Sequence, residues 1–187
     1  MTITINRRKL FFWFILIAVL LGVGAATWQY LPGGATGKAS AAKPVEPPDV
    51  AAVKFAQAFY TLDYRNETSW LAKLQPLSSQ DGYSLLNDTL APLVWPKFTA
   101  AQSVATADQI TVKDQGLKAQ GTSSLGQWQI RAVSITIAPE VAWPDAREIN
   151  TNMLLSLDNG AWKFGSFLDD ASLAVYQTAT GTATPAP

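Results

Sequence analysis

The longest apolar stretch of the chain lies close to its amino end. Residues 10–28 form a run of nineteen residues without a charge, and three basic residues at positions 7–9 precede it directly. At ~1.5 Å per residue such a run forms a helix of roughly 28 Å, which matches the ~30 Å hydrocarbon layer of a bilayer. Basic residues before a span keep the amino end in the cytoplasm. The pattern therefore predicts a cytoplasmic segment at residues 1–9, a transmembrane anchor at 10–30, and an extracytoplasmic remainder.

A cleaved signal peptide is the alternative interpretation of this run. Gly24 and Ala26 are small enough for a cleavage site, and the basic start suits a secretory leader. The apolar core of a signal peptide normally spans about 7 to 15 residues, however, and the run at 10–28 is longer. Retention as a membrane anchor is therefore favoured.

Two stretches poor in large apolar residues flank the rest of the sequence. Residues 31–48 contain glycines, alanines, lysines and four prolines without apolar periodicity, which is typical of a linker. Residues 173–187 run into threonine, alanine, glycine and proline, which cannot bury enough apolar surface to fold alone. We therefore expect one extracytoplasmic domain at residues 49–172, followed by a disordered tail.

The first half of that domain has the periodicity of helices. Behind two prolines, Asp49 is a good N-cap, and apolar residues recur at helical spacing over residues 50–65. This pattern predicts one long amphipathic helix. Two shorter helical patterns follow at residues 69–77 and 79–90. Pro92 and Pro96 are then expected to end helix formation, because proline lacks the backbone N–H that a helix interior needs.

The second half alternates apolar and polar residues, as β-strands do. A strand is predicted to begin at residue 109, and three more are predicted at residues 127–137, 149–157 and 162–168. Asp158, Asn159 and Gly160 supply the turn of a hairpin between the last two. Trp128 and Ile130 have the opposite parity to Val133, Ile135 and Ile137, which predicts a bulge or a strong bend near Ala132.

Helices followed by strands indicate an α+β domain. We expect the long helix and the two short helices to pack on a curved four-stranded antiparallel sheet in a cone-like arrangement. The long helix should cover the concave face, where Trp162 and Phe164 should meet it through Phe59.

Three sequence stretches carry a resemblance to a known family: FAQAFYTLDYR in the long helix, SWLAKLQPLSS in the short helices, and DNGAWKFGSFL in the last hairpin. Together with the anchor and linker, this order resembles the membrane-anchored nuclear-transport-factor-2-like domains. These include the bitopic inner-membrane scaffold of type IV secretion systems and its counterparts in Gram-positive conjugation machines. The resemblance covers about residues 48–168 and rests on architecture and loose pattern. It implies the cone fold and, for function, a scaffold, although similar domains also accompany lipid-uptake systems.

Composition and charge exclude several kinds of chemistry. The chain has no cysteine and no histidine, so disulfides, thiolate nucleophiles and the commonest metal ligand are absent, and no cofactor is expected. From residue 50 onward, nine basic residues face twelve acidic ones, a net charge of −3. No basic stripe is present for a phosphate backbone, so direct nucleic-acid binding is not expected.

A few residues remain as candidates for a site. Tyr60, Asp63 and Arg65 at the end of the long helix could line the mouth of a cavity, although they form no complete catalytic set. Trp95 and Trp143 each precede a proline, and in such an irregular stretch a partly exposed aromatic side chain can anchor a partner. We therefore assign no catalytic, cofactor or metal residue and treat the two tryptophans as candidate partner contacts.

These observations favour a non-enzymatic, single-pass protein of the cell membrane. Its extracytoplasmic domain would scaffold an envelope complex such as a conjugation or secretion machine, as a single copy or as a homo-oligomer. Two alternatives stay open at this point: a module that binds a lipid or small apolar ligand for a transport system, and an isomerase-like enzyme of the same superfold. A deep apolar pocket would favour the ligand-binding module, whereas a filled cone with an exposed apolar edge would favour the scaffold.

Overall fold

The computed structural model of this protein describes residues 46–180. The predicted cytoplasmic segment, the anchor at 10–30 and most of the linker lie outside this range. None of the helices within it is both long and apolar enough to cross a bilayer. The described residues form an α+β structure in which several helices precede a four-stranded antiparallel sheet, so the predicted fold class is confirmed at this level.

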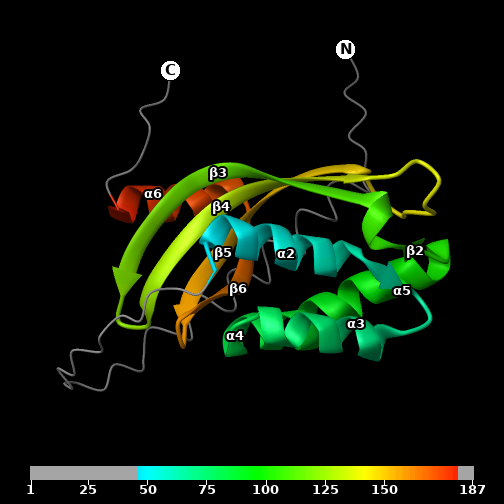
Figure 1. Cartoon of the computed structure of the whole chain (residues 1–187), viewed down its shortest axis with the longest axis horizontal. Coiled ribbons are helices and arrows are strands. Elements are labelled where there is room, and N and C mark those ends of the chain that lie inside the picture. Colours follow the sequence, from blue (N-terminus) through cyan, green and yellow to red (C-terminus); the bar gives the residue numbers. More distant parts are fainter. Residues whose placement is uncertain (1–45, 181–187) are drawn as a thin grey trace, which may run out of the picture. The chain divides into compact units, whose positions relative to one another are not determined.

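The sheet is an antiparallel meander whose strands lie in sequence order. Its strands are β3 (Ile110–Ser123), β4 (Gly126–Ile137), β5 (Glu148–Asp158) and β6 (Ala161–Leu168). Figure 1 shows the sheet curving over the helices, with α2 (Pro48–Tyr60) lying along its concave side. At the β5–β6 turn, Asn159 and Gly160 have φ angles of 51° and 82°, so the turn predicted at residues 158–160 is confirmed.

The irregularity predicted near Ala132 is present in the sheet, but it does not take the form of a bulge in β4. Strand β4 pairs with β5 without a break, whereas the register shifts occur in its other partner, β3. One shift lies between Asp114 and Gly116 and the other between Leu117 and Ala119. The extra residues of β3 bend the edge strand opposite Ala132, and β4 itself stays regular.

Along β4 the buried residues change from even-numbered to odd-numbered positions, because the sheet carries one apolar core on each of its two faces. Val133 belongs to the main core beneath α2, whereas Ile130 belongs to a second cluster with Leu173 and Tyr176 of α6 (Asp170–Thr180). Because successive side chains of a strand point to opposite faces, a switch of the buried parity means a switch of the covered face.

Helix α6 corrects the predicted end of the domain. The tail was expected to begin at residue 173, but the helix continues to Thr180, and residues 181–187 lie outside the described range. Asp169 caps the helix, because its Oδ1 accepts a hydrogen bond of 2.8 Å from the Ser172 N–H. The second apolar cluster then holds the helix on the sheet. Helix α6 has few large apolar side chains, but Leu173 and Tyr176 suffice to hold it in place because they pack on a face of the sheet.

The helical layer contains one helix more than predicted. It comprises α2, α3 (Glu67–Leu74), a 3₁₀ turn (Gln75–Leu77), α4 (Gln80–Leu85), a π-helical turn (Leu86–Leu90) and α5 (Ala91–Ala101). The expectation that Pro92 and Pro96 end helix formation is wrong. Pro92 occupies the first turn of α5, where its N–H is not needed. Pro96 is an exposed interior residue, and the neighbouring Trp95 and Phe98 are buried in the core, which outweighs the missing hydrogen bond.

The long helix ends at Tyr60, earlier than its pattern indicates. Residues Leu62–Asp63 form the short strand β1, which pairs with β2 (Val104–Ala105) directly after α5. This two-stranded sheet takes over the backbone hydrogen bonds that a longer helix would have made. It also joins the end of α2 to the end of the helical layer.

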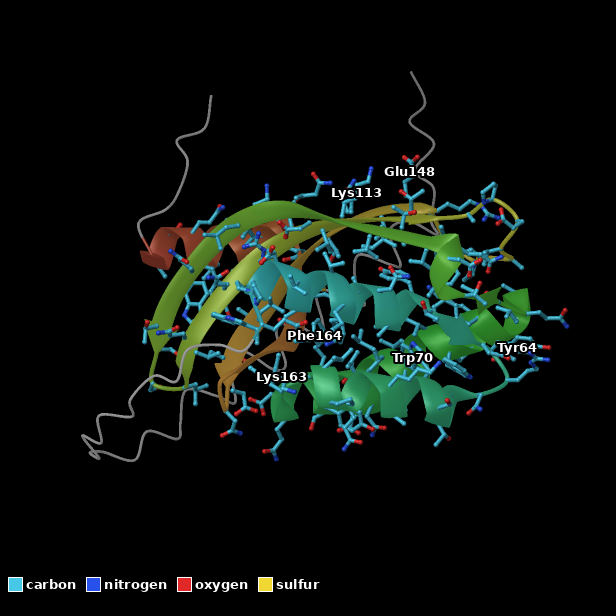
Figure 2. All side chains as sticks on the ribbon, viewed as in Figure 1. Tyr64, Trp70, Lys113, Glu148, Lys163 and Phe164 are labelled. Carbon is cyan, nitrogen blue, oxygen red and sulfur yellow. The ribbon has the colours of Figure 1, made fainter. Side chains whose placement is uncertain are left out.

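The main core fills the space between α2 and the sheet. Phe55 of α2 stacks on Phe164 of β6 with ring centroids 3.8 Å apart, and the two rings are 1% and 0% exposed. Phe164 therefore meets α2 through Phe55, whereas Phe59 contacts Phe167 and Trp70. Figure 2 shows Phe164 and Trp70 inside the molecule, between the sheet and the lower helices.

Trp70 ties α3 to the last turn of α2. Its Nε1–H donates a hydrogen bond of 2.8 Å to the Phe59 carbonyl, and the tryptophan is 1% exposed. Carbonyls in the last turn of a helix have no partner within the helix, so this bond satisfies a group that would otherwise be buried unpaired.

We expect Trp70→Phe to lower the free energy of unfolding by ~1–3 kcal/mol, the cost of leaving a buried carbonyl without its donor. Trp95→Phe is the matched control, since it removes the same part of a buried ring while no hydrogen bond of the Trp95 side chain is found in residues 46–180. Denaturant unfolding followed by fluorescence measures both. Equal losses for the two variants would show that ring volume, and not the hydrogen bond, carries the effect.

Candidate functional site

The structure gathers three of the predicted site residues in one aromatic cluster. Tyr60 lies at the end of α2, and Trp143 lies in the loop between β4 and β5, with ring centroids 5.9 Å apart. Phe98 of α5 joins them, 4.9 Å from Trp143 and 6.1 Å from Trp95. The cluster therefore links α2, α5 and the β4–β5 loop, which are distant in sequence.

Trp95 does not have the exposure that a partner contact needs. Its side chain is only 9% exposed and packs against Trp70 and Phe98, so the expectation of a partly exposed Trp95 is wrong. The reason is that Trp95 lies on the inner side of a regular helix and not in an irregular stretch. Trp143 is partly buried and packs at the edge of the main core, which leaves it as the remaining aromatic candidate of the pair.

Tyr60 is a core residue with a perturbed hydroxyl. Burial, reinforced by the negative charge of Asp145, raises the pKa of Tyr60 to about 12. The phenol therefore stays protonated throughout the physiological pH range. It can donate a hydrogen bond but cannot serve as a base.

Asp63 and Arg65 form an exposed ion pair with each other. Arg65 donates from Nε to Oδ1 of Asp63 at 2.8 Å and from Nη2 to Oδ2 at 2.5 Å, and its backbone N–H adds a third bond to Oδ1 at 3.0 Å. The hydrogen bonds from Arg65 lower the pKa of Asp63 to about 2. A carboxylate that is held ionised in this way is a poor proton acceptor.

The expected pocket mouth is therefore not assembled as predicted. Tyr60 is inside the core, and the Asp63–Arg65 pair is at the surface. Two surface hollows within residues 46–180 have volumes of about 550 and 430 Å³, and neither is lined by any of the three residues. The predicted residues are neighbours in space, but they do not converge on a cavity.

A second, more buried ion pair was not predicted. Arg131 of β4 donates to Asp114 of β3 from Nε at 2.8 Å and from Nη2 at 2.6 Å, and the two side chains are 14% and 23% exposed. The hydrogen bonds from Arg131 lower the pKa of Asp114. The Gly116 N–H, displaced by the first register shift of β3, also donates to Asp114. The sequence signal for this ion pair was the presence of oppositely charged residues in the interiors of the two adjoining strands, Asp114 in β3 and Arg131 in β4.

We expect Asp114→Asn to lower the free energy of unfolding at pH 7 by ~1–3 kcal/mol, the range for hydrogen bonds to a charged group. The pKa of Asp114 is lower in the folded state, so its stabilisation is present above the unfolded value of ~3.9 and is lost as the pH falls through the folded value. Unfolding titrations at pH 7 and pH 3 should therefore show the difference between the two proteins shrinking in acid. Asp63→Asn, which breaks an exposed pair, should change stability little; equal losses for both variants would contradict the assignment.

The larger of these two hollows is an open groove on the outer side of α2, with a volume of about 550 Å³. We call it the α2 groove; it is lined by Val50, Val53, Lys54, Gln57, Ala58, Thr61, Lys73, Leu77 and Ala107. One wall is held by Gln57, whose amide donates to the carbonyls of Ala107 and Ile110 at 2.9 and 3.1 Å. The sequence signal that could have revealed it is the presence of Val50, Val53 and Ala58 on the polar side of the amphipathic helix.

Across residues 46–180, no three carboxylate side chains lie close enough together to hold a metal ion. Asp63 and Asp114 are each paired with an arginine, and Asp145 lies 3.8 Å from Lys97.

Comparison with known proteins adds no identification. No protein-family model matches this chain. No curated protein matches it either.

Proposed function

We propose that this chain is a non-enzymatic, single-pass protein of the cell membrane whose extracytoplasmic domain scaffolds an envelope protein complex. The observation that carries the proposal is the contrast between the two sides of α2. Its inner side is packed solid against the sheet, whereas its outer side lines an open groove with Val50, Val53 and Lys54. Val50, 44% exposed, leaves apolar surface on this side that a partner protein would cover.

The filled interior also weighs against the ligand-carrier alternative. A carrier of the cone type needs an enclosed apolar cavity between the helix and the sheet. Phe55, Phe164 and Leu155 occupy that space and are at most 1% exposed. The nuclear-transport-factor-2-like fold remains part of the proposal, and the curved sheet with a helix in its concave side supports it.

The ionisation of the candidate site supports a non-enzymatic role. Tyr60 is held protonated and Asp63 is held ionised by Arg65. These pKa shifts move both groups away from neutral pH, whereas a general acid or base works best with a pKa near the operating pH.

Topology gives the first test of the proposal. Protease added to intact spheroplasts should digest the domain at residues 46–180 and leave an amino-terminal tag protected, because the basic residues at positions 7–9 hold that end in the cytoplasm. Lysed spheroplasts serve as the control, in which both parts should be cut. Protection of the domain in intact cells would contradict the assignment.

The scaffold role itself is tested by chemical cross-linking of the full-length chain in native envelopes, followed by purification and mass spectrometry. We expect the same membrane or envelope proteins in fixed ratio to the chain in each preparation. If the chain is recovered without protein partners and with one lipid per copy, the carrier alternative replaces the scaffold.

A further inference from the structure

The outer side of α2 mixes apolar and polar residues. The fully buried side of the helix carries Ala52, Phe55, Ala56 and Phe59. The opposite side carries Val50, Val53 and Ala58 together with Lys54 and Gln57 along the groove. Ala58 packs partly against the main core, whereas Val50 is 44% exposed and Val53 is half-buried. The two valines therefore leave apolar surface open beside the polar groups of the groove.

The charges beside the groove indicate what kind of occupant fits. Lys54 and Lys73 both line it, and no acidic residue does so. Lys54 has Glu46 as an ion-pair partner at 3.5 Å, whereas Lys73 has no ion pair within the described residues. A complementary occupant therefore combines aliphatic side chains with carboxylates.

The chain's own remaining segments do not have this chemistry. Residues 1–45 contain basic residues but no aspartate or glutamate, and residues 181–187 carry no ionisable side chain. Charge complementarity therefore favours a segment of another molecule. The groove lies between α2, the end of α3 and the 3₁₀ turn Ala107–Gln109, and it is open to solvent, which suits the side chains of a larger molecule better than an enclosed small ligand.

We propose that the α2 groove binds an acidic amphipathic helix of a partner protein. Aliphatic side chains spaced i, i+3/i+4 and i+7 along that helix occupy the groove over Val53 and Ala58, and its carboxylates lie against Lys54 and Lys73. This is the mode by which an amphipathic helix enters an apolar groove. The proposal rests on the scaffold function and adds to it the class of partner and the surface used.

The test uses the full-length chain in nanodiscs of a neutral phospholipid and two fluorescent eighteen-residue peptides with the same leucine pattern. One peptide carries glutamates on its polar face and the other carries lysines; empty nanodiscs correct for binding to lipid. Fluorescence anisotropy should show that the chain binds the acidic peptide at least about tenfold more tightly than the basic one. The double variant Lys54→Glu, Lys73→Glu should reverse this preference.

Matched variants distinguish an effect of charges in the groove from an effect of the overall charge of the chain. Lys113→Glu combined with Lys118→Glu makes the same charge change on β3, outside the residues that line the groove; Figure 2 shows Lys113 on the opposite side of the sheet from α2. This control should keep the preference of the unmodified chain. Val53→Asp should abolish binding of the acidic peptide, with an unchanged circular-dichroism spectrum as the check on folding.

Three results would overturn the proposal. The first is that charge reversal at Lys113 and Lys118 changes the peptide preference as much as charge reversal at Lys54 and Lys73. The second is that the unmodified chain does not bind the acidic peptide. The third is that dodecanoate binds with the same dependence on Lys54 and Lys73 while neither peptide does, which would make the groove a lipid site. Each of these leaves the envelope cross-linking result unaffected, so failure of the groove and failure of the scaffold are distinguishable.

Discussion

Replacing Phe164 with alanine is expected to lower the free energy of unfolding by about 3–5 kcal/mol, the range for an aromatic ring removed from a packed core. Phe164 is fully buried, and its ring stacks on Phe55 and contacts Phe167 at a centroid distance of 4.8 Å. The side chain therefore joins β6 to α2, and its loss leaves a cavity between helix and sheet. Denaturant unfolding followed by tryptophan fluorescence measures the change.

Two further variants make this result specific. Phe164→Leu keeps most of the volume and should cost clearly less than the alanine variant. Leu125→Ala removes an apolar side chain that is 87% exposed in the β3–β4 turn and should change stability by no more than about 0.5 kcal/mol. If Phe164→Ala behaves like Leu125→Ala, the main core does not lie where Phe55 and Phe164 place it.

Gly82→Ala is expected to be nearly as damaging, by at least about 3 kcal/mol, at the upper end of the range for overpacking. A Cβ at Gly82 would lie 2.2 Å from the Phe164 carbonyl oxygen, which is backbone and cannot rotate away. Helix α4 is held this close because the backbone N–H of Ser79 donates to the same carbonyl at 2.9 Å and its hydroxyl does so at 3.1 Å. Inserting a methyl group must break these bonds or move β6.

The control for this variant lies on the same helix. Ser84 is exposed on α4, and Ser84→Ala should leave stability unchanged or raise it slightly, because alanine has the better helix propensity. Thermal unfolding of both variants, measured side by side, tests the contact. A stability gain for Gly82→Ala would mean that α4 does not touch β6 in the way described.

Local pattern was enough for the elements whose signals are local. The change from helical spacing to alternation placed the helices before the strands, and the Asp158–Gly160 sequence identified the β5–β6 turn. Asn159 and Gly160 tolerate positive φ in any context, so no distant contact is needed to predict this turn. The α+β class and the four antiparallel strands follow from the same kind of signal.

The predictions that were wrong share one cause. In each case the structure of a segment depends on the distant residues that it packs against. Local pattern predicts that Pro96 ends the helix, but the core contacts of Trp95 and Phe98 keep α5 helical around it. Local pattern also predicts a tail from residue 173, yet Leu173 and Tyr176 pack on the outer face of the sheet. Local propensity is a weak prior that tertiary contacts override.

The residues of the candidate site also have some properties that local sequence predicts and others that depend on tertiary contacts. From the sequence alone, Tyr60, Asp63 and Arg65 could be placed near the end of one helix, because they are neighbours in the chain. Only the tertiary structure decided that Tyr60 is buried and that the other two pair with each other at the surface. The pair of Arg131 and Asp114 depends on a register shift in β3.

The order of helices and strands, the hairpin turn and the lack of histidine and cysteine chemistry could be predicted from the sequence. These properties belong to short segments or to composition. Contacts between distant segments determine on which face of β4 each side chain is buried, which part of α2 stays exposed, and which charged residues pair. Such properties depend on contacts between distant segments, and the free energy of those contacts outweighs the weaker preferences of each segment alone.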